Sequence, residues 1–194
     1  MNIEYEATFP DINKDEIRAG LKKVGAKLLR SEFLMKRVSF YAPDKGKHKW
    51  LRVRDEGDKI TMSLKIIGKK NNIEDQKEIC LEIDDFNRGI SFLESIKCGK
   101  KAYQESKREI WDLDGVEICI DEWPFLEPFV EVEGKNEEEV KRASEKLGFD
   151  YGQAMFCSVA DLYSSKYGIS EDIICNHIDR ITFDKNPFEK HLKK

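Results

Sequence analysis

Two pairs of glutamates, each separated by a single residue, stand in stretches where apolar and polar residues alternate. Glu4 and Glu6 lie in IEYEATF, and Glu131 and Glu133 lie in FVEVEG. Since alternate residues of a β-strand point to the same face, each pair places two carboxylates side by side. Several carboxylate oxygens, together with the phosphates of a substrate, are the ligands that Mg²⁺ prefers. Such a face either lies in solvent or holds a cation.

Basic residues follow the same alternation in the stretches between the two glutamate pairs. Arg52 and Arg54 share one strand face, and Lys65 and Arg108 lie on the polar faces of later strands. Arginine outnumbers lysine on these faces although lysine is plentiful elsewhere, and arginine is the better bidentate partner for phosphate oxygens. A solvated face of an antiparallel sheet is the plain alternative. The separation of acids from bases favours a face that binds metal and phosphate.

The alternating stretches predict the elements that must position these residues. Eight strands are expected at 2–9, 34–41, 50–55, 60–67, 76–84, 103–112, 115–122 and 128–134, and helices at 14–24, 85–97, 136–147 and 159–167. Tight turns at Asp114-Gly115 and around Gly57 predict consecutive hairpins, and therefore an antiparallel sheet in an α+β fold. If the sheet closes, its polar face becomes the lining of a tunnel. The other face, which includes Ile3, Ile79 and Leu81, is expected to be buried under the helices.

Composition narrows the class of protein. The 194 residues carry 38 acidic and 34 basic side chains with a net charge of −4, and this balance argues against a general or sequence-specific nucleic-acid-binding surface. No apolar run approaches the ~20 residues of a membrane span, and the N-terminus lacks a signal-peptide core. The five scattered cysteines indicate reduced thiols in a cytoplasmic protein. We expect one domain over residues 1–167 and a C-terminal extension over 168–194, where periodicity is weak.

Several short motifs occur in an order that resembles a known family. These are the Glu-x-Glu first strand, LRVR, SLK, SKREIW, IDEW and FVEVEG, which together span about Asn2 to Tyr167. The sequence resembles the CYTH superfamily, named for class IV adenylate cyclases and thiamine triphosphatase and also called triphosphate tunnel metalloenzymes. The resemblance implies an eight-stranded antiparallel tunnel that binds a small-molecule triphosphate with Mg²⁺ or Mn²⁺, in a monomer or homodimer.

The resemblance also implies a role for individual residues. Four carboxylates look like metal ligands, four basic residues look like ligands of the phosphate chain, and two further carboxylates are candidates to orient a water molecule. The metal ligands are Glu4, Glu6, Glu131 and Glu133; the phosphate ligands are Arg52, Arg54, Lys65 and Arg108; the catalytic carboxylates are Glu78 and Asp121.

The sequence departs from the family pattern at three positions. The signature lysine of the first strand is replaced by Thr8, the fifth strand carries Cys80 in place of a second glutamate, and Ser106 stands where many relatives have a base. Lys36 and Arg37 are candidates to supply the missing positive charge, and Arg37 is expected on the phosphate-binding face.

Three functions agree with these residues. The leading hypothesis is a metal-dependent triphosphatase acting on inorganic triphosphate, a nucleoside triphosphate or thiamine triphosphate. The second is a class IV adenylate cyclase, in which a ribose hydroxyl replaces water as the attacking group. The third is a triphosphate-binding module without turnover.

Overall fold

The strands form one sheet that closes on itself. In the computed structural model, which describes residues 1–44, 48–68 and 73–191, the strand order is β1-β6-β5-β4-β3-β7-β8-β9-β2, with every pair antiparallel. The path begins and ends on the same N-terminal run, because Glu4 alone separates β1 from β2. The sheet is therefore a barrel, and β1 and β2 together make one of the eight predicted strands. This confirms the predicted α+β tunnel.

The strand bounds agree with the alternating pattern over most of the barrel. The strands are β1 (Asn2–Ile3), β2 (Tyr5–Phe9), β3 (Lys27–Tyr41), β4 (Lys49–Asp55), β5 (Ile60–Ile67), β6 (Gln76–Ile83), β7 (Lys100–Leu113), β8 (Val116–Glu122) and β9 (Phe129–Gly134). The predicted turn between β7 and β8 is present, with Asp114 and Gly115 at φ values of 56° and 86°. Two successive residues with positive φ are typical of the type I′ turn, which glycine adopts without strain.

Strand β3 begins at Lys27, seven residues before the predicted start. Register shifts against β7 fall between Leu28 and Arg30 and between Arg30 and Phe33. Each bulge interrupts the two-residue period, so this part of the strand has no clean alternation to recognise.

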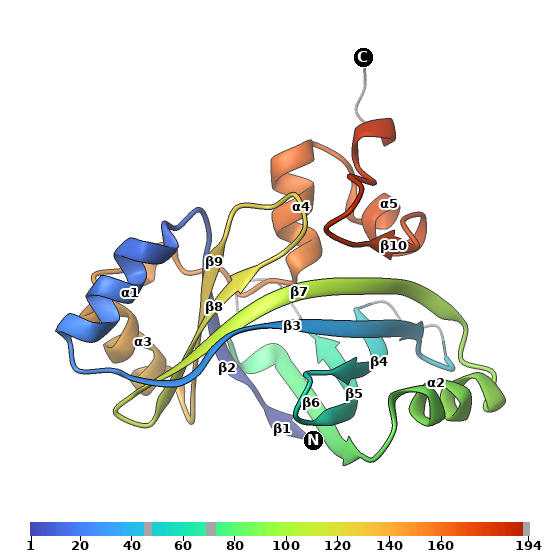
Figure 1. Ribbon diagram of the computed structural model, residues 1–194, viewed down its shortest axis with the longest axis horizontal. Helices are drawn as coiled ribbons and strands as arrows, with labels where there is room; N and C mark the ends of the chain where they lie inside the picture. Colours follow the sequence, from blue (N-terminus) through green and yellow to red (C-terminus); the bar gives the residue numbers. More distant parts are fainter. Residues whose placement is uncertain (45–47, 69–72, 192–194) are drawn as a thin grey trace.

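Helices cover two sides of the barrel and one of its mouths (Figure 1). α1 (Lys14–Lys23) and α3 (Glu137–Lys146) contribute Leu21 and Val140 to a core against β2, β8 and β9. α2 (Phe86–Ser95) packs on β4 and β5. The side chains of Asn13 and Asn136 cap α1 and α3 by accepting backbone N–H groups of the first turns. Three single-turn 3₁₀ helices complete the secondary structure: η1 (Ile73–Asp75), η2 (Tyr151–Gln153) and η3 (Glu189–His191).

Part of the outer face that we expected to be buried is exposed. Ile3, Ile79 and Leu81 have exposed fractions of 41%, 45% and 53%. These residues lie on β1 and β6, whereas α2 packs on β4 and β5. The prediction that the helices cover the whole apolar face was therefore wrong for these two strands.

The C-terminal segment packs over one mouth of the barrel (Figure 1). It comprises α4 (Val159–Tyr167), α5 (Glu171–Asn176) and β10 (Arg180–Ile181), and β10 pairs in parallel with β7. Phe188 is fully buried, with ring centroids 4.3 Å from Tyr163 and 4.8 Å from Tyr167. No helix in the described part of the chain is long and apolar enough to cross a bilayer.

Candidate active site

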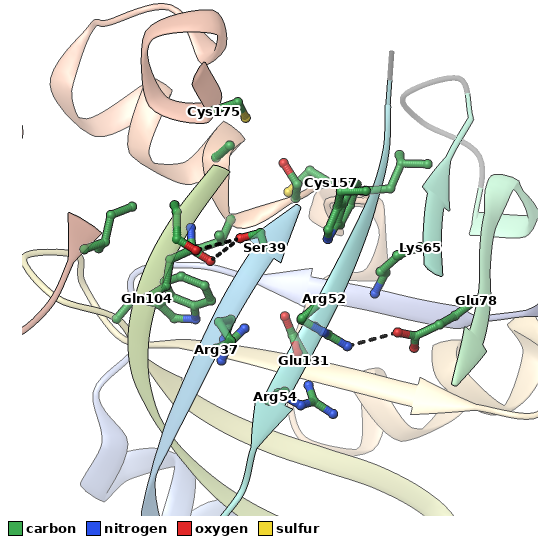
Figure 2. A pocket seen from close by; sticks show the side chains of 18 of the residues that line it. Arg37, Ser39, Arg52, Arg54, Lys65, Glu78, Gln104, Glu131, Cys157 and Cys175 are labelled. Atoms are coloured by element: carbon green, nitrogen blue, oxygen red, sulfur yellow. Dashed lines mark hydrogen bonds and ion pairs between the residues drawn. The ribbon is translucent and has the colours of Figure 1, made fainter. Parts of the chain in front are cut away.

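The barrel encloses a cavity of about 340 Å³ lined by charged side chains (Figure 2). Twelve of the lining residues carry charged side chains, of which six are basic and six are acidic. The basic residues are Arg37, Arg52, Arg54, Lys65, Lys101 and Arg108, and the acidic residues are Glu4, Glu6, Glu78, Glu117, Glu131 and Glu133.

The two signs of charge occupy opposite halves of the barrel. The bases come from β7, β3, β4 and β5, which are contiguous in the strand order. The acids come from β6, the β1/β2 run, β9 and β8, which are contiguous across the closure. The two-residue period of each strand determines which side chains point into the cavity. The strand order then places the basic side chains in one half of the barrel and the acidic side chains in the other.

The basic half has hydrogen-bond donors without acceptors. The Nε atoms of Arg37, Arg52 and Arg54 are buried and have no hydrogen-bond partner among the described residues. Burial, followed by the charges of Arg52, Arg54 and Arg108, lowers the pKa of Arg37 well below its usual range. Buried donors are almost always satisfied in folded proteins, and crowded guanidinium groups are stabilised by an anion. This half is therefore built to receive a polyanion.

Several bases are held in place by carboxylates. Arg108 donates two hydrogen bonds to the carboxylate of Asp121, from Nε at 2.8 Å and from Nη2 at 2.7 Å. Glu131 forms a second ion pair with Arg108. Burial alone would lower the pKa of Arg108, but nearby acidic groups, Asp121 foremost, outweigh it and hold that pKa well above its usual value.

A second set of contacts positions the guanidinium groups of β3 and β4. Arg37 donates to the hydroxyl of Ser106 and its guanidinium lies 4.4 Å from the centroid of the Trp123 ring. Arg54 pairs with Glu56 at 2.6 Å. These contacts fix the bases before any ligand arrives, which lowers the entropic cost of binding.

The acidic half holds carboxylates whose negative charges oppose one another. Burial, and after it the charge of Glu131, raises the pKa of Glu6 to about 8, even though Lys65 lowers it. Burial also raises the pKa of Glu4 to about 7 against the effect of Lys65, whose Nζ lies 2.9 Å from Glu4. Burial likewise raises the pKa of Glu133. Close carboxylates with raised pKa values attract either protons or a metal cation.

Glu78 behaves differently from its neighbours. Burial raises its pKa, but a hydrogen bond with Glu4 and the charges of Arg52 and Lys65 outweigh that effect and lower the pKa to about 2. Its carboxylate lies 3.0 Å from Arg52. Glu78 is therefore ionised at neutral pH.

The acidic half fits a hard divalent cation in the type and charge of its donors. Four of its carboxylates come from two adjacent strand runs, with Glu6 opposite Glu133 and Thr8 opposite Glu131 in the β2–β9 register. Among residues 1–44, 48–68 and 73–191, no three His, Cys, Asp or Glu side chains already form a metal-binding group. Glu4 and Glu131 are paired with Lys65 and Arg108 instead, and a cation would compete with these bases.

The structure brings most of the predicted site residues into the cavity. The four predicted metal ligands, the five predicted phosphate ligands and Glu78 line it. Asp121 is fully buried behind Arg108 and is not a lining residue. Thr8 is buried and forms an isolated antiparallel β-bridge with Met155. Lys36, the other candidate for the missing charge, is exposed on the outer side of β3.

Several further lining residues had no predicted role in the site, among them Trp50, Lys101, Gln104 and Glu117. Trp50 and Glu117 follow the same alternation as Arg52 and Asp121, so their inward direction could have been found from the strand pattern. Gln104 lies within the predicted strand and follows the same alternation as Arg108. Lys101 could not be found in this way, because β7 starts three residues before the predicted position.

Solved structures with the same fold come from distant organisms. A conserved hypothetical protein from Pyrococcus furiosus matches with a TM-score of 0.69 at 22% identity, covering 82% of this chain and 99% of its own. A "putative adenylate cyclase" from Vibrio parahaemolyticus matches with a TM-score of 0.71 at 14% identity, covering 84% and 98%. A Hippeastrum protein, described as a "putative adenylyl cyclase" with a dominant triphosphatase activity, has a TM-score of 0.58 at 15% identity and covers 86% and 97%. At these identities the likeness shows the fold alone.

Comparison with curated proteins gives no match. The model of the CYTH domain matches residues 2–160, which include every strand of the barrel and every charged residue that lines the cavity. The chain belongs to the CYTH domain family.

Proposed function

We propose that this protein is a divalent-metal-dependent hydrolase of triphosphate-bearing substrates. The observation that carries the proposal is the division of one buried cavity into a basic half and an acidic half. A triphosphate chain has enough negative charge to occupy several arginines at once, and its remaining charge requires cations on the other side. A simple anion-binding pocket would have no use for the crowded carboxylates.

The basic half would bind and align the phosphate chain. The three unpaired Nε–H groups of Arg37, Arg52 and Arg54 would donate to phosphate oxygens. Arg108 would do so with its guanidinium held by Asp121, which makes Asp121 a positioning residue in this proposal. Lys65, which is directly opposite Trp50 in the β4–β5 pairing, would neutralise further phosphate charge.

The acidic half would hold the metal through Glu4, Glu6, Glu131 and Glu133. A bound Mg²⁺ or Mn²⁺ would neutralise phosphate charge and polarise the phosphorus centre. Glu78, ionised at neutral pH, would accept a hydrogen bond from the attacking water and orient it. Water would add to the terminal phosphorus, the bond from that phosphorus to the bridging oxygen would break, and orthophosphate and a proton would be released.

Product analysis tests this proposal directly. The protein is incubated with tripolyphosphate or with ATP, each with Mg²⁺ or Mn²⁺, and the products are separated by ion chromatography. Orthophosphate with diphosphate, or with ADP, is the expected result. Cyclic AMP with pyrophosphate would instead identify a cyclase, and tight binding without products would identify a binding module.

Variants connect the products to the cavity. Glu4→Ala and Glu6→Ala should each lose phosphate release, since each removes a carboxylate from the acidic half. Glu138→Gln on the exposed face of α3 is a matched control and should retain wild-type turnover. Unchanged turnover in both cavity variants would overturn the assignment.

A further inference from the structure

Arg37 is held differently from the other arginines of the cavity. The other three each form an ion pair with a carboxylate; the pairs are Arg52–Glu78, Arg54–Glu56 and Arg108–Asp121. Among the described residues Arg37 forms no such pair, and its guanidinium contacts the hydroxyl of Ser106 and the ring of Trp123 instead. A carboxylate offsets part of a positive charge, whereas an aromatic ring attracts a guanidinium and leaves its charge intact. Arg37 therefore keeps its whole charge for an anion.

The neighbouring bases make a neutral support necessary. Arg54 is directly opposite Arg37 in the β3–β4 register, and both reach into the same part of the cavity as Arg52 (Figure 2). Like charges at this spacing repel one another. Without a carboxylate partner, the guanidinium of Arg37 would turn away from its neighbours unless another group fixed it. The Trp123 ring, whose centroid lies 4.4 Å from that guanidinium, is such a group.

Trp123 begins the loop between β8 and β9, and α4 lies beside this loop (Figure 1). The hydroxyl of Tyr163 donates to the backbone carbonyl of Pro124 at 2.7 Å, and that of Tyr167 donates to the carbonyl of Phe125 at 2.8 Å. Phe125 has a φ of 59°, a conformation that a bulky residue keeps only where its surroundings hold it. The rings of Tyr163 and Trp123 also meet edge to face, with centroids 6.4 Å apart. α4 therefore fixes both the loop and the Trp123 ring.

The chain beyond α4 fixes the two tyrosines in turn. The ring of Phe188 stacks on those of Tyr163 and Tyr167, with centroid distances of 4.3 Å and 4.8 Å. The side-chain amide of Asn186 donates to the hydroxyl of Tyr167 at 3.4 Å. All four residues lie beyond residue 160, where the match to the CYTH model ends. Tyr167, Asn186 and Phe188 are not among the described residues that line the cavity, so they influence a ligand only through the residues that they hold.

Resting on the proposed function, we propose that the C-terminal segment sets the affinity for triphosphate through Trp123. Tyr163 and Tyr167 hold the β8–β9 loop, and the loop holds the Trp123 ring. The ring in turn keeps the guanidinium of Arg37 where it donates to a phosphate oxygen. Trp123 and Tyr167 are positioning residues in this inference, because they act on the ligand through Arg37.

Calorimetry with tripolyphosphate and Mg²⁺ tests the inference with two variants, each made in the wild type and in Arg37→Met. Trp123→Leu removes the aromatic ring and should weaken binding about tenfold. Tyr167→Phe removes one hydroxyl outside the cavity and should weaken binding about threefold. In Arg37→Met each change should alter the affinity by less than about twofold, because the residue that they position is already gone. Circular dichroism establishes folding, and Tyr167→Phe carries the test if Trp123→Leu does not fold.

Trp111→Leu and Tyr151→Phe are the matched controls. Trp111 belongs to the core under α1 and α3, and the hydroxyl of Tyr151 donates to Glu137. Both controls, once folded, should bind tripolyphosphate as tightly as the wild type. If Trp123→Leu and Tyr167→Phe leave binding unchanged, or weaken it equally with and without Arg37, the inference is overturned and the proposed function stands. If the wild type neither binds nor hydrolyses any triphosphate, the proposed function fails and this inference fails with it.

Discussion

Replacing Glu6 by glutamine should stabilise the metal-free protein at pH 8, although Glu6 is one of the residues we assign to the metal site. Burial and then the neighbouring charge of Glu131 raise the pKa of Glu6 from its ordinary 4.5 to about 8. Below pH 4.5 the carboxyl is protonated in the folded and unfolded states alike. Between pH 4.5 and 8 only the folded state keeps the proton. The free energy of unfolding therefore falls as the pH rises through this range.

The size of the effect follows from the two pKa values. At 1.36 kcal/mol per pKa unit, the full difference corresponds to about 5 kcal/mol. Rearrangement of protons and ion pairs around Glu4 and Lys65 absorbs part of it, so about 2–4 kcal/mol is the expected gain for Glu6→Gln at pH 8. For a chain of this length each kcal/mol raises Tm by about 2–4 °C. The variant should thus melt roughly 4–16 °C higher than the wild type.

Thermal unfolding followed by circular dichroism, with EDTA present, measures this difference. The gap in Tm should be present at pH 8 and should vanish near pH 4.5, where the wild-type carboxyl is protonated. Glu138→Gln, which removes an exposed carboxylate from α3, should show no gap at either pH. If Glu6→Gln melts at the wild-type temperature at pH 8, Glu6 does not lie in a crowded, desolvated cluster, and the argument for a cation in this half of the cavity loses its basis.

Three further predictions address the basic half, the C-terminal segment and the metal. Arg37→Met should weaken tripolyphosphate binding about 10- to 150-fold, the equivalent of a charged hydrogen bond of 1.5–3 kcal/mol, whereas Lys36→Met on the outer face should not; calorimetry compares them. Phe188→Ala should lower the free energy of unfolding by about 3–5 kcal/mol, measured by urea denaturation, because its fully buried ring stacks on two tyrosines. A loss under 1 kcal/mol would mean that the segment does not pack on the barrel. Removing divalent metal with EDTA should abolish phosphate release, and Mg²⁺ or Mn²⁺ should restore it; full activity in EDTA would refute the metal requirement.

Most of the charged lining of the cavity could be predicted from the sequence because it depends on a short-range property. A period of two places Arg52 and Arg54, or Glu131 and Glu133, on one face wherever the strand is regular. Alternation alone does not place Asp121 relative to Arg108. The two-residue turn at Asp114-Gly115 does so, because it sets the register of β7 against β8, in which the two residues are directly opposite. Local alternation identifies a face but not the partners across it.

In the C-terminal segment, α4 was predicted at its observed bounds, whereas α5 and β10 were beyond sequence reasoning for a different reason. α5 has six residues and β10 has two, too few to show a period. Such short elements are stable only through tertiary contacts, here the parallel pairing with β7 and the burial of Phe188. Nothing in the sequence indicated that β1 and β6 would lack a covering helix, because the connecting loops, and not the strands, determine where a helix packs.

The replacement of the family's lysine by Thr8 becomes intelligible once the strand order is known. Residue 8 lies on β2, in the acidic half, and is directly opposite Glu131. A lysine there would place a cation among the carboxylates and lower the pKa of Glu6 by its charge. With threonine at this position, every basic side chain that lines the cavity comes from β7, β3, β4 or β5. Arg37 adds positive charge in that basic half, where its unpaired Nε is available to a phosphate oxygen. Under the proposed function, the substitution would leave the carboxylates to a metal ion and would concentrate phosphate binding on the arginines.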